Sequence, residues 1–274
     1  MISIKELVYA SRKYSLKSVL INVFSIATSD FVIVSFQKCG KTWLRVMLAK
    51  VLSKEYGIKK LKLDLQFMTL FHPRFPNILI SHAGSTKDNN KINFTKIYKK
   101  KKIIFLVRDP RDIVVSLFHG SRTRDKVYDG EDISLFIKNQ NCGFQKIINF
   151  MNLWAQEMSK RPKDFIVIKY EDLKNDAANE LKKIFDFVKI EVKNEIIDQA
   201  VAYGSFDNMR KMEMAGVIKD YRMKPGNVND PNSFRTRKGK VGGYKEELSE
   251  EDINYMEELM SKKLNPFFDY MENI

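Results

Sequence analysis

Cysteine is scarce in this sequence, which has Cys39 and Cys142 among its 274 residues. Two isolated cysteines provide no disulfide framework, and such sparse use suits a reducing cytoplasm, where we expect the protein to reside. The short cysteine and histidine spacings of zinc sites are missing as well, so we expect no metal. No apolar run reaches the roughly 18 residues of a membrane-spanning helix, so we expect no transmembrane segment. Residues 13–30 place basic residues before a short apolar stretch, and we interpret them as a packed helix rather than a signal peptide.

Acidic residues are too few to balance the basic ones, because 34 Asp and Glu stand against 48 Lys and Arg, a net charge of +14. Such a charge is compatible with a basic nucleic-acid-binding protein, which is one alternative. The lysines are scattered, however, with one dense cluster at residues 96–104 (KIYKKKKII), and no recognition motif accompanies them. We therefore interpret the charge as a solvated surface whose field attracts a small polyanion, and we expect no nucleic-acid partner.

Four apolar runs indicate buried strands: Phe31–Phe36, Asn77–Ala83, Lys102–Val107 and Asp164–Tyr170. They are rich in Ile, Val and Phe without strict alternation, as strands covered on both faces are. Helical patterns occupy residues 42–52, 110–118, 135–158 and 180–188, and a capping box at Ser249 and Asp252 opens a C-terminal helix over 249–264. Alternating strands and helices predict a single α/β domain over residues 1–274, with three layers and a central, mostly parallel sheet. Pro, Gly and Asn in residues 214–237 predict a long loop.

The segment between the first strand and the first helix resembles a phosphate-binding loop. Residues 35–42, SFQKCGKT, match the Walker pattern G-x-x-x-x-G-K-[ST] except that Ser35 replaces the first glycine. Such a strand–loop–helix offers unsatisfied backbone N–H groups and the positive end of the helix dipole to a phosphate. An ATPase also needs an acidic residue at the end of a buried strand to hold magnesium, but here Arg108 precedes Asp109. The arginine at this point favours direct binding of an anion without a metal. A P-loop kinase or NTPase that uses Mg-ATP and Lys41 is the other alternative.

Four motifs resemble, in order, those of the sulfotransferases that use 3′-phosphoadenosine 5′-phosphosulfate (PAPS) and release 3′,5′-bisphosphoadenosine (PAP). Residues 36–43, FQKCGKTW, resemble the family's 5′-phosphosulfate loop, P-K-S-G-T-T-W. Residues 108–116, RDPRDIVVS, resemble its 3′-phosphate motif, an arginine followed eight positions later by a serine. Residues 170–176, YEDLKND, are similar to its Y-E-D segment, and residues 235–245, RTRKGKVGGYK, resemble its C-terminal signature R-K-G-x-x-G-[DN]-[WY]-K. The resemblance covers a nucleotide-binding core of about residues 30–245.

The resemblance implies transfer of the sulfuryl group of PAPS, without a metal, to a hydroxyl or an amine of a small-molecule, lipid or glycan acceptor. It implies Lys38 at the bridging oxygen of the leaving phosphate, and His82, after the second strand, as the general base with His119 as the fallback. Ser116 is implied beside the 3′-phosphate and joins Lys38 and His82 in the implied catalytic set. The residues implied at PAPS are Lys38, Cys39, Gly40, Lys41, Thr42, Trp43, Arg108, Ser116, Tyr170, Ser205, Phe206, Met209, Arg237, Lys238 and Gly239.

The chain departs from the family pattern inside two of these motifs. Gln37 replaces the usual proline, Cys39 replaces serine, and Gly243 stands where aspartate or asparagine is common. Lys41 replaces a threonine of the family, and the sequence leaves open whether its side chain adds charge at the phosphate or points outward.

Three further features stay open at this stage. Trp43 fits both core packing and contact with adenine. Residues 214–231 are a candidate lid over the acceptor. The family's dimerisation segment has a valine where this chain has Glu250, so the sequence assigns neither an oligomeric state nor a particular acceptor.

Overall fold

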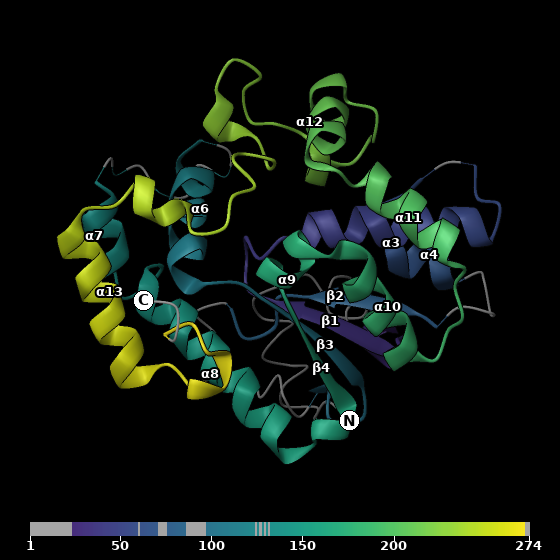
Figure 1. Cartoon of the computed structure of the whole chain (residues 1–274), viewed down its shortest axis with the longest axis horizontal. Helices are drawn as coiled ribbons and strands as arrows, with labels where there is room; N and C mark the ends of the chain where they lie inside the picture. The colour runs from purple at the N-terminus through teal and green to yellow at the C-terminus, as the bar shows by residue number, and fades with distance from the viewer. Residues whose placement is uncertain are drawn as a thin grey trace.

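A four-stranded parallel sheet forms the centre of the computed structural model, which describes residues 24–59, 61–70, 76–85, 97–123, 125, 128, 130 and 132–271. The strands follow the order β2 (Ile78–Ser81), β1 (Phe31–Ser35), β3 (Lys102–Val107) and β4 (Phe165–Lys169), and every neighbouring pair is parallel (Figure 1). All residues of β1 are buried, as expected for a run with no polar face. The four predicted strands are therefore confirmed.

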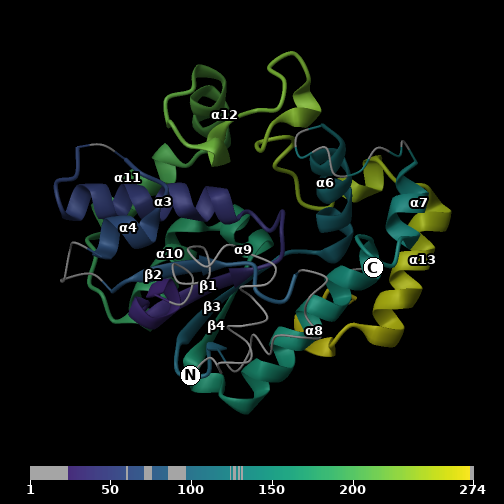
Figure 2. The same ribbon diagram turned by 180° about the vertical axis from the view of Figure 1, so that it is seen from behind.

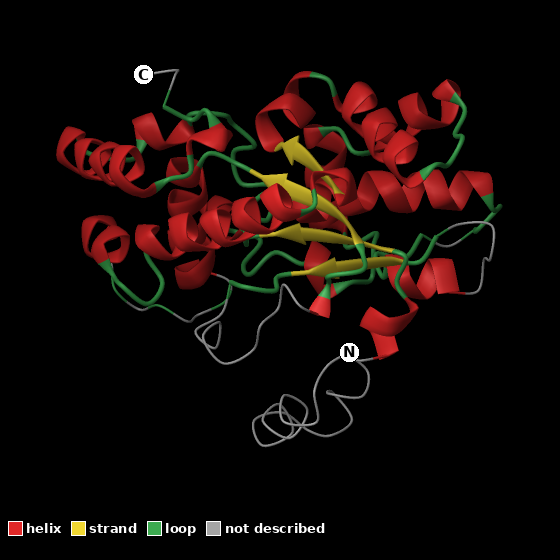
Figure 3. Ribbon diagram, turned by 90° about the horizontal axis from the view of Figure 1, so that it is seen from below, coloured by secondary structure: helices red, strands yellow, loops and turns green. Residues whose placement is uncertain are grey.

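Helices lie on both sides of the sheet, which confirms the three-layer α/β prediction (Figure 3). The longer helices are α3 (Lys41–Glu55), α6 (Pro110–Thr123), α8 (Phe144–Lys160), α10 (Ala177–Val188), α11 (Asn194–Tyr203), α12 (Phe206–Ala215) and α13 (Glu250–Lys263). The shorter ones are α4 (Leu65–Leu70), α7 (Ile133–Lys138) and α9 (Tyr170–Asn175). In Figures 1 and 2, α6, α7, α8 and α13 gather at one side of the molecule, and α3, α4, α10 and α11 gather at the other.

Local sequence signals explain where several helices begin. Pro110 is the first residue of α6, where its fixed φ and missing N–H cost nothing. Ser249 precedes α13, and its hydroxyl accepts a hydrogen bond from the backbone N–H of Asp252 at 3.2 Å. The capping signal read at Ser249 is therefore confirmed. On α3, Val46, Met47 and Val51 are fully buried, so this side of the helix packs into the core.

One helical prediction was wrong, because residues 135–158 form two helices rather than one. The chain leaves the helix after Lys138, and the side-chain oxygen of Asn139 accepts hydrogen bonds from the backbone N–H groups of Asn141 and Cys142. A Cβ atom at Gly143 would lie about 2.5 Å from the Phe136 and Asn139 carbonyl oxygens. Glycine thus permits a tight turn between α7 and α8 that helical periodicity alone does not reveal.

The segment from 216 to 242 crosses from α12 to α6 (Figures 1 and 2). It contains the short 3₁₀ helices η3 (Tyr221–Met223) and η4 (Pro231–Ser233), and Thr123 at the end of α6 donates a hydrogen bond to the Asn232 carbonyl at 3.3 Å. The prediction of a long loop is thus confirmed after Ala215, where α12 ends. Residues 13–23 of the N-terminal stretch lie outside the described residues. Within the described part of the chain, no helix is both long and apolar enough to cross a membrane.

Candidate functional site

A tight turn joins β1 to α3. Lys38 and Gly40 both have left-handed backbone conformations, with φ of 66° and 84°. A Cβ atom at Gly40 would lie 2.6 Å from a ring carbon of Tyr170, so this position requires glycine for space as well as for conformation. Among the described residues, no side chain caps the N-terminus of α3, so its first N–H groups remain donors for a ligand. The turn therefore has the form of an anion-binding site.

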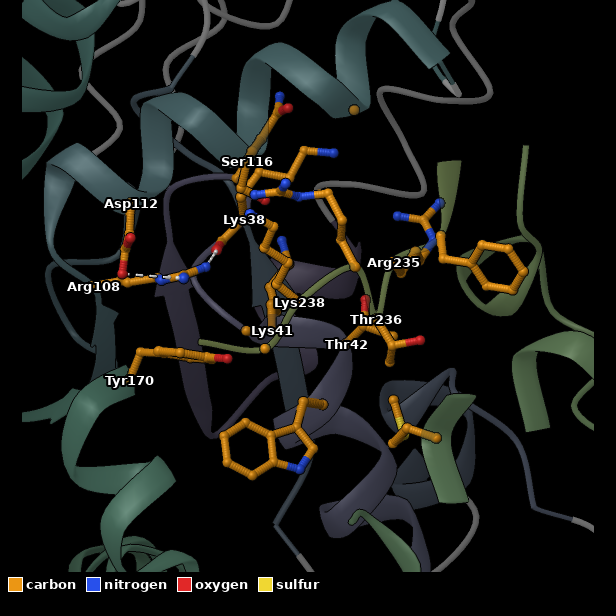
Figure 4. A pocket seen from close by; sticks show the side chains of 18 of the residues that line it. Lys38, Lys41, Thr42, Arg108, Asp112, Ser116, Tyr170, Arg235, Thr236 and Lys238 are labelled. Atoms are coloured by element: carbon orange, nitrogen blue, oxygen red, sulfur yellow. Dashed lines mark hydrogen bonds and ion pairs between the residues drawn. The ribbon is translucent and has the colours of Figure 1, made fainter. Parts of the chain in front are cut away.

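This turn forms one wall of a cavity of about 510 Å³ at the carboxyl ends of the strands (Figure 4). Gln37, His82, Arg108 and Tyr170, which follow β1, β2, β3 and β4, all line it. Ligands of open parallel sheets bind at this edge, where the strand order reverses. The residues predicted from the sequence that line the cavity are Lys38, Gly40, Lys41, Thr42, Trp43, His82, Arg108, Ser116, Tyr170, Phe206, Met209, Arg237, Lys238 and Gly239, and the fallback base His119 lines it too.

Two residues predicted at the cofactor do not line the cavity. The Cys39 side chain is 1% exposed, and burial raises the pKa of its thiol to about 12, which excludes a reactive thiolate at neutral pH. Ser205 instead caps α12, where its hydroxyl accepts a hydrogen bond from the backbone N–H of Asn208. Both side chains have structural partners, so only their backbone groups are left to contact a ligand.

Arg108 connects three of the sequence motifs. Its guanidinium donates to the Lys38 carbonyl at 3.3 Å and to the Lys240 carbonyl at 2.9 Å, and it lies 4.3 Å from the centre of the Tyr170 ring. Its Nε is buried and has no hydrogen-bond partner among the described residues, so the side chain keeps a donor for a ligand. The close-up shows Arg108 between Lys38, Asp112 and Tyr170 (Figure 4).

Asp112 is a site residue that sequence analysis missed. It is 3% exposed and pairs with Arg108 at 3.3 Å, one helical turn away. It also accepts hydrogen bonds from the backbone N–H groups of Gly242 and Tyr244, at 2.9 and 3.1 Å. Asp112 therefore ties the C-terminal motif to the start of α6. Its position in the first turn of a helix was visible in the sequence, but Gly242 and Tyr244, whose N–H groups it binds, lie more than a hundred residues away.

Glu247 gathers the cations at the other end of the cavity. It pairs with Arg237 at 2.7 Å, with Lys238 at 2.9 Å and with Nε2 of His119 at 2.6 Å. Burial raises the pKa of Glu247, but hydrogen bonds from His119, Lys238 and Arg237 outweigh it and lower the pKa to about 2. The carboxylate thus stays ionised and holds these side chains around one point, much as a phosphate would.

Lys41 does not point outward. Its Nζ contacts Nε2 of His82, and Nδ1 of the same ring lies 3.1 Å from the Ser35 carbonyl oxygen. Burial lowers the pKa of Lys41 to about 6, with a further contribution from the positive charge of Arg45. Burial also lowers the pKa of His82, to about 3, and the charge of Lys41 is the second cause.

Aromatic side chains border the same cavity. Trp43 is partly buried, donates from Nε1 to the Gly204 carbonyl at 2.6 Å, and meets Tyr170 edge to face at 5.7 Å. Phe206 lies against Gly239, where a Cβ atom would be 2.6 Å from the ring. Trp43 therefore packs on the core and borders the cavity at once, so both interpretations of it are compatible with the structure.

The acidic residue that a Walker-type site would use is already paired. The Asp109 carboxylate is 8% exposed and accepts a two-pronged contact from Arg111, with the Nη2 bond at 2.8 Å. Among the described residues, no group of three or more His, Cys, Asp or Glu side chains has an arrangement that would hold a metal ion.

Comparison with known families gives one consistent result. The chain matches the family model described as the sulfotransferase domain over residues 28–268. Sulfotransferase 2A1 of Rattus norvegicus is 25% identical over 264 residues, covering 90% of this chain and 88% of that protein. The amine sulfotransferase of Oryctolagus cuniculus is 22% identical over 268 residues, covering 89% and 83%. The 3-beta-hydroxysteroid sulfotransferase of Cavia porcellus is 25% identical over 257 residues, covering 88% and 85%.

Solved structures share the fold. The mouse sulfotransferase SULT7A1 complexed with PAP has a TM-score of 0.61 at 21% identity, and the match covers 88% of each chain. Retinol dehydratase in complex with androsterone and the inactive cofactor PAP has a TM-score of 0.63 at 17% identity, covering 88% of this chain and 83% of that one.

Proposed function

Because the chain belongs to the sulfotransferase family, whose model spans residues 28–268, we propose that it transfers the sulfuryl group of PAPS to a hydroxyl or an amine of an acceptor. One observation carries the proposal: a single cavity is lined by two groups of basic side chains, Lys38 and Lys41 at the turn, and Arg108, Arg237 and Lys238 further along. PAPS carries negative charge at two positions, the 5′-phosphosulfate and the 3′-phosphate. Both ends of the molecule would thus meet cationic donors.

Lys38 is proposed to stabilise the leaving group. Transfer forms a bond from the acceptor oxygen or nitrogen to sulfur and breaks the bond from sulfur to the bridging oxygen, so negative charge grows on the phosphate. Lys38 stands in the turn after β1, and its Nζ lies 3.5 Å from Asp125 at the edge of the cavity. A cation fixed near the point where charge develops lowers the barrier without reorganising solvent.

His82 is proposed to act as the general base. A carbonyl oxygen only accepts hydrogen bonds, so Nδ1, 3.1 Å from the Ser35 carbonyl, carries the ring proton and Nε2 has the free lone pair. His82 lines the cavity, and we propose that Nε2 takes the proton from the acceptor as its oxygen or nitrogen attacks sulfur. PAP then leaves with the electron pair of the broken bond.

The far end of the cavity is proposed to hold the 3′-phosphate and the adenine. Within the described part of the chain, the buried Nε of Arg108 lacks a hydrogen-bond partner, and Ser116 of α6 lines the same cavity. Arg237 and Lys238 are already drawn together by Glu247. The edges of Trp43 and Phe206 offer apolar surface for the base.

The acceptor is proposed to enter under the segment after α12. Tyr221 lines the cavity, which supports the candidate lid over residues 214–231, and Asn232, directly after that range, lines it too. Relatives are named for an amine and for a 3-beta-hydroxysteroid, so an amine or an alcohol on a small molecule or lipid is the first acceptor to test.

Calorimetry with PAP and with ATP, each with and without magnesium, tests the proposed function. We expect tight binding of PAP that magnesium does not change, and weaker binding of ATP. A preference for Mg-ATP would overturn the proposal in favour of a P-loop kinase or NTPase.

Replacing Arg108 with alanine should weaken PAP binding by about 10- to 100-fold, because a charge-assisted contact to the 3′-phosphate contributes roughly 1.5–3 kcal/mol. Adenosine 5′-monophosphate, which lacks the 3′-phosphate, is the matched ligand, and its affinity should change by only a few-fold. Calorimetry with both ligands measures the difference. Equal losses for the two ligands would show that Arg108 acts by shaping the turn through the Lys38 carbonyl rather than by binding the 3′-phosphate.

A further inference from the structure

The contact between Lys41 and His82 is not explained by the catalytic roles assigned above. Lys41 is the first residue of α3, and its Nζ reaches Nε2 of His82, which follows β2. Nδ1 of that ring donates its proton to the Ser35 carbonyl, so the lone pair of the imidazole is on Nε2. The nitrogen that is proposed to accept the acceptor's proton is therefore the one that Lys41 occupies.

Lys41 is surrounded by cations rather than by counter-ions. Burial lowers its pKa to about 6, and Arg45 on α3 and Arg222 on η3 lower it further, while the Cys39 thiol acts in the opposite sense. Arg222 already has its own partner, since it pairs with Asp220 at 2.8 Å. Among the described groups that act on Lys41, none is a carboxylate. An anion that enters beside the turn would thus be the first strong counter-ion within its reach.

His82 is affected by the same group of cations. Burial is the largest cause that lowers the pKa of His82 to about 3, and the charge of Lys41 is the second. Arg45 of α3 and Lys38 of the turn lower this pKa further. The hydrogen bond to the Ser35 backbone opposes them. A base is most effective when its pKa lies near the working pH, so His82 in this arrangement is a weak one.

We propose that Lys41 holds Nε2 of His82 in the free protein and moves onto the phosphosulfate when PAPS binds, which frees this nitrogen for the acceptor. The proposal rests on the proposed function and adds a positioning residue to it. Lys38, Gly40 and Thr42 line the same cavity as Lys41, so an anion bound by the turn would lie next to the first residue of α3. The lysine side chain has four rotatable bonds, so the change requires no movement of the backbone. PAPS thereby activates the base only when the group to be transferred is in place.

Nuclear magnetic resonance titration of His82 tests the proposal without any acceptor. His82 is one of three histidines, and its signal is assigned by its loss in His82→Asn. The wild type is compared with Lys41→Thr, each free and saturated with PAP, whose 5′-phosphate occupies the same end of the cavity. Lys54→Thr is the matched control, because this exposed lysine lies on the last turn of the same helix.

In the free protein, Lys41→Thr should raise the pKa of His82 by about one unit or more, since a neighbouring positive charge is removed. PAP should raise the pKa of His82 in the wild type by more than in Lys41→Thr, where only the ligand's own charge acts. Lys54→Thr should behave as the wild type. Calorimetry in buffers of different ionisation enthalpy measures how many protons the protein takes up when PAP binds. Near pH 7 the wild type should take up about one proton more than Lys41→Thr, because Lys41 becomes charged beside the anion.

An unchanged pKa of His82 in free Lys41→Thr would overturn the contact itself. Equal PAP-induced shifts in wild type and variant would overturn the movement of Lys41. Failure of the wild type to bind PAP would instead overturn the proposed function, and the free-protein comparison would still report on the contact.

Discussion

Replacing Lys38 with alanine is expected to lower kcat for sulfuryl transfer by about 10²–10³-fold while the affinity for PAP changes by only a few-fold. Lys38 lines the cavity from the turn after β1. In the proposed mechanism its charge acts on a phosphate oxygen that becomes fully negative only as the sulfur–oxygen bond breaks. The measurement is transfer of a radiolabelled sulfuryl group from PAPS to a panel of phenols, aliphatic alcohols and amines, with PAP binding followed by calorimetry.

Lys174→Ala is the matched control for this variant. Lys174 also lines the cavity, but it lies on α9 after β4, and its Nζ is 5.9 Å from the ring centre of Trp43. Its loss should change kcat by only a few-fold. A Lys38→Ala enzyme that keeps more than about a tenth of its kcat would contradict the role of Lys38. A P-loop kinase that uses Mg-ATP would become the better explanation if Lys41→Ala abolished the enzyme's turnover of Mg-ATP while Lys38→Ala left it intact.

Replacing His82 with asparagine is expected to lower kcat by about 10²–10⁴-fold, the usual contribution of a general base. Asparagine keeps a polar side chain of similar length but has no basic nitrogen. The base is active when neutral, so activity is lost as pH falls through its pKa. Burial and Lys41 lower the pKa of His82 in the free protein to about 3. The value of kcat/KM for PAPS reports the free enzyme, so protonation of His82 should not lower it at any pH above about 5.

His119→Asn separates the two candidate bases. Nε2 of His119 donates a hydrogen bond to the Glu247 carboxylate at 2.6 Å, among the residues proposed for the 3′-phosphate. Its replacement should raise the KM for PAPS more than it lowers kcat. The opposite pattern, a large loss of kcat in His119→Asn and near-normal kcat in His82→Asn, would make His119 the base.

The sheet could be predicted closely from the sequence because each strand is a short, mostly apolar run. The structure places the first strand at Phe31–Ser35 and the third at Lys102–Val107, within one residue of the runs. Helix boundaries were harder to predict where the break depends on one residue. The break between α7 and α8 depends on Gly143, where the Cβ atom of any other residue would clash with carbonyl oxygens of the preceding turn. The periodic pattern itself continues through this break. The helices α9, α11 and α12 were not predicted as helices, since short amphipathic segments carry weak periodicity.

The site divides in the same way. Residues that belong to contiguous motifs were predicted from the resemblance of those motifs to the family's, and most of them line one cavity. Contacts between motifs were not predictable, because they depend on where side chains from distant segments meet. Asp112 bonds the backbone at 242 and 244, and Lys41 reaches His82 across 41 positions of the chain. Neither pairing leaves a local pattern in the sequence.

The link from Asp112 to the backbone N–H groups of Gly242 and Tyr244 also bears on how the protein acquires its ligand during synthesis. The turn at Lys38 leaves the ribosome early, but Arg108 gains its full set of neighbours only after the segment around Lys240 has emerged. A nascent chain that ends before this segment therefore lacks part of the cavity proposed to hold the nucleotide. The nucleotide should consequently stabilise the finished domain as one cooperative unit, rather than any part that folds on the way.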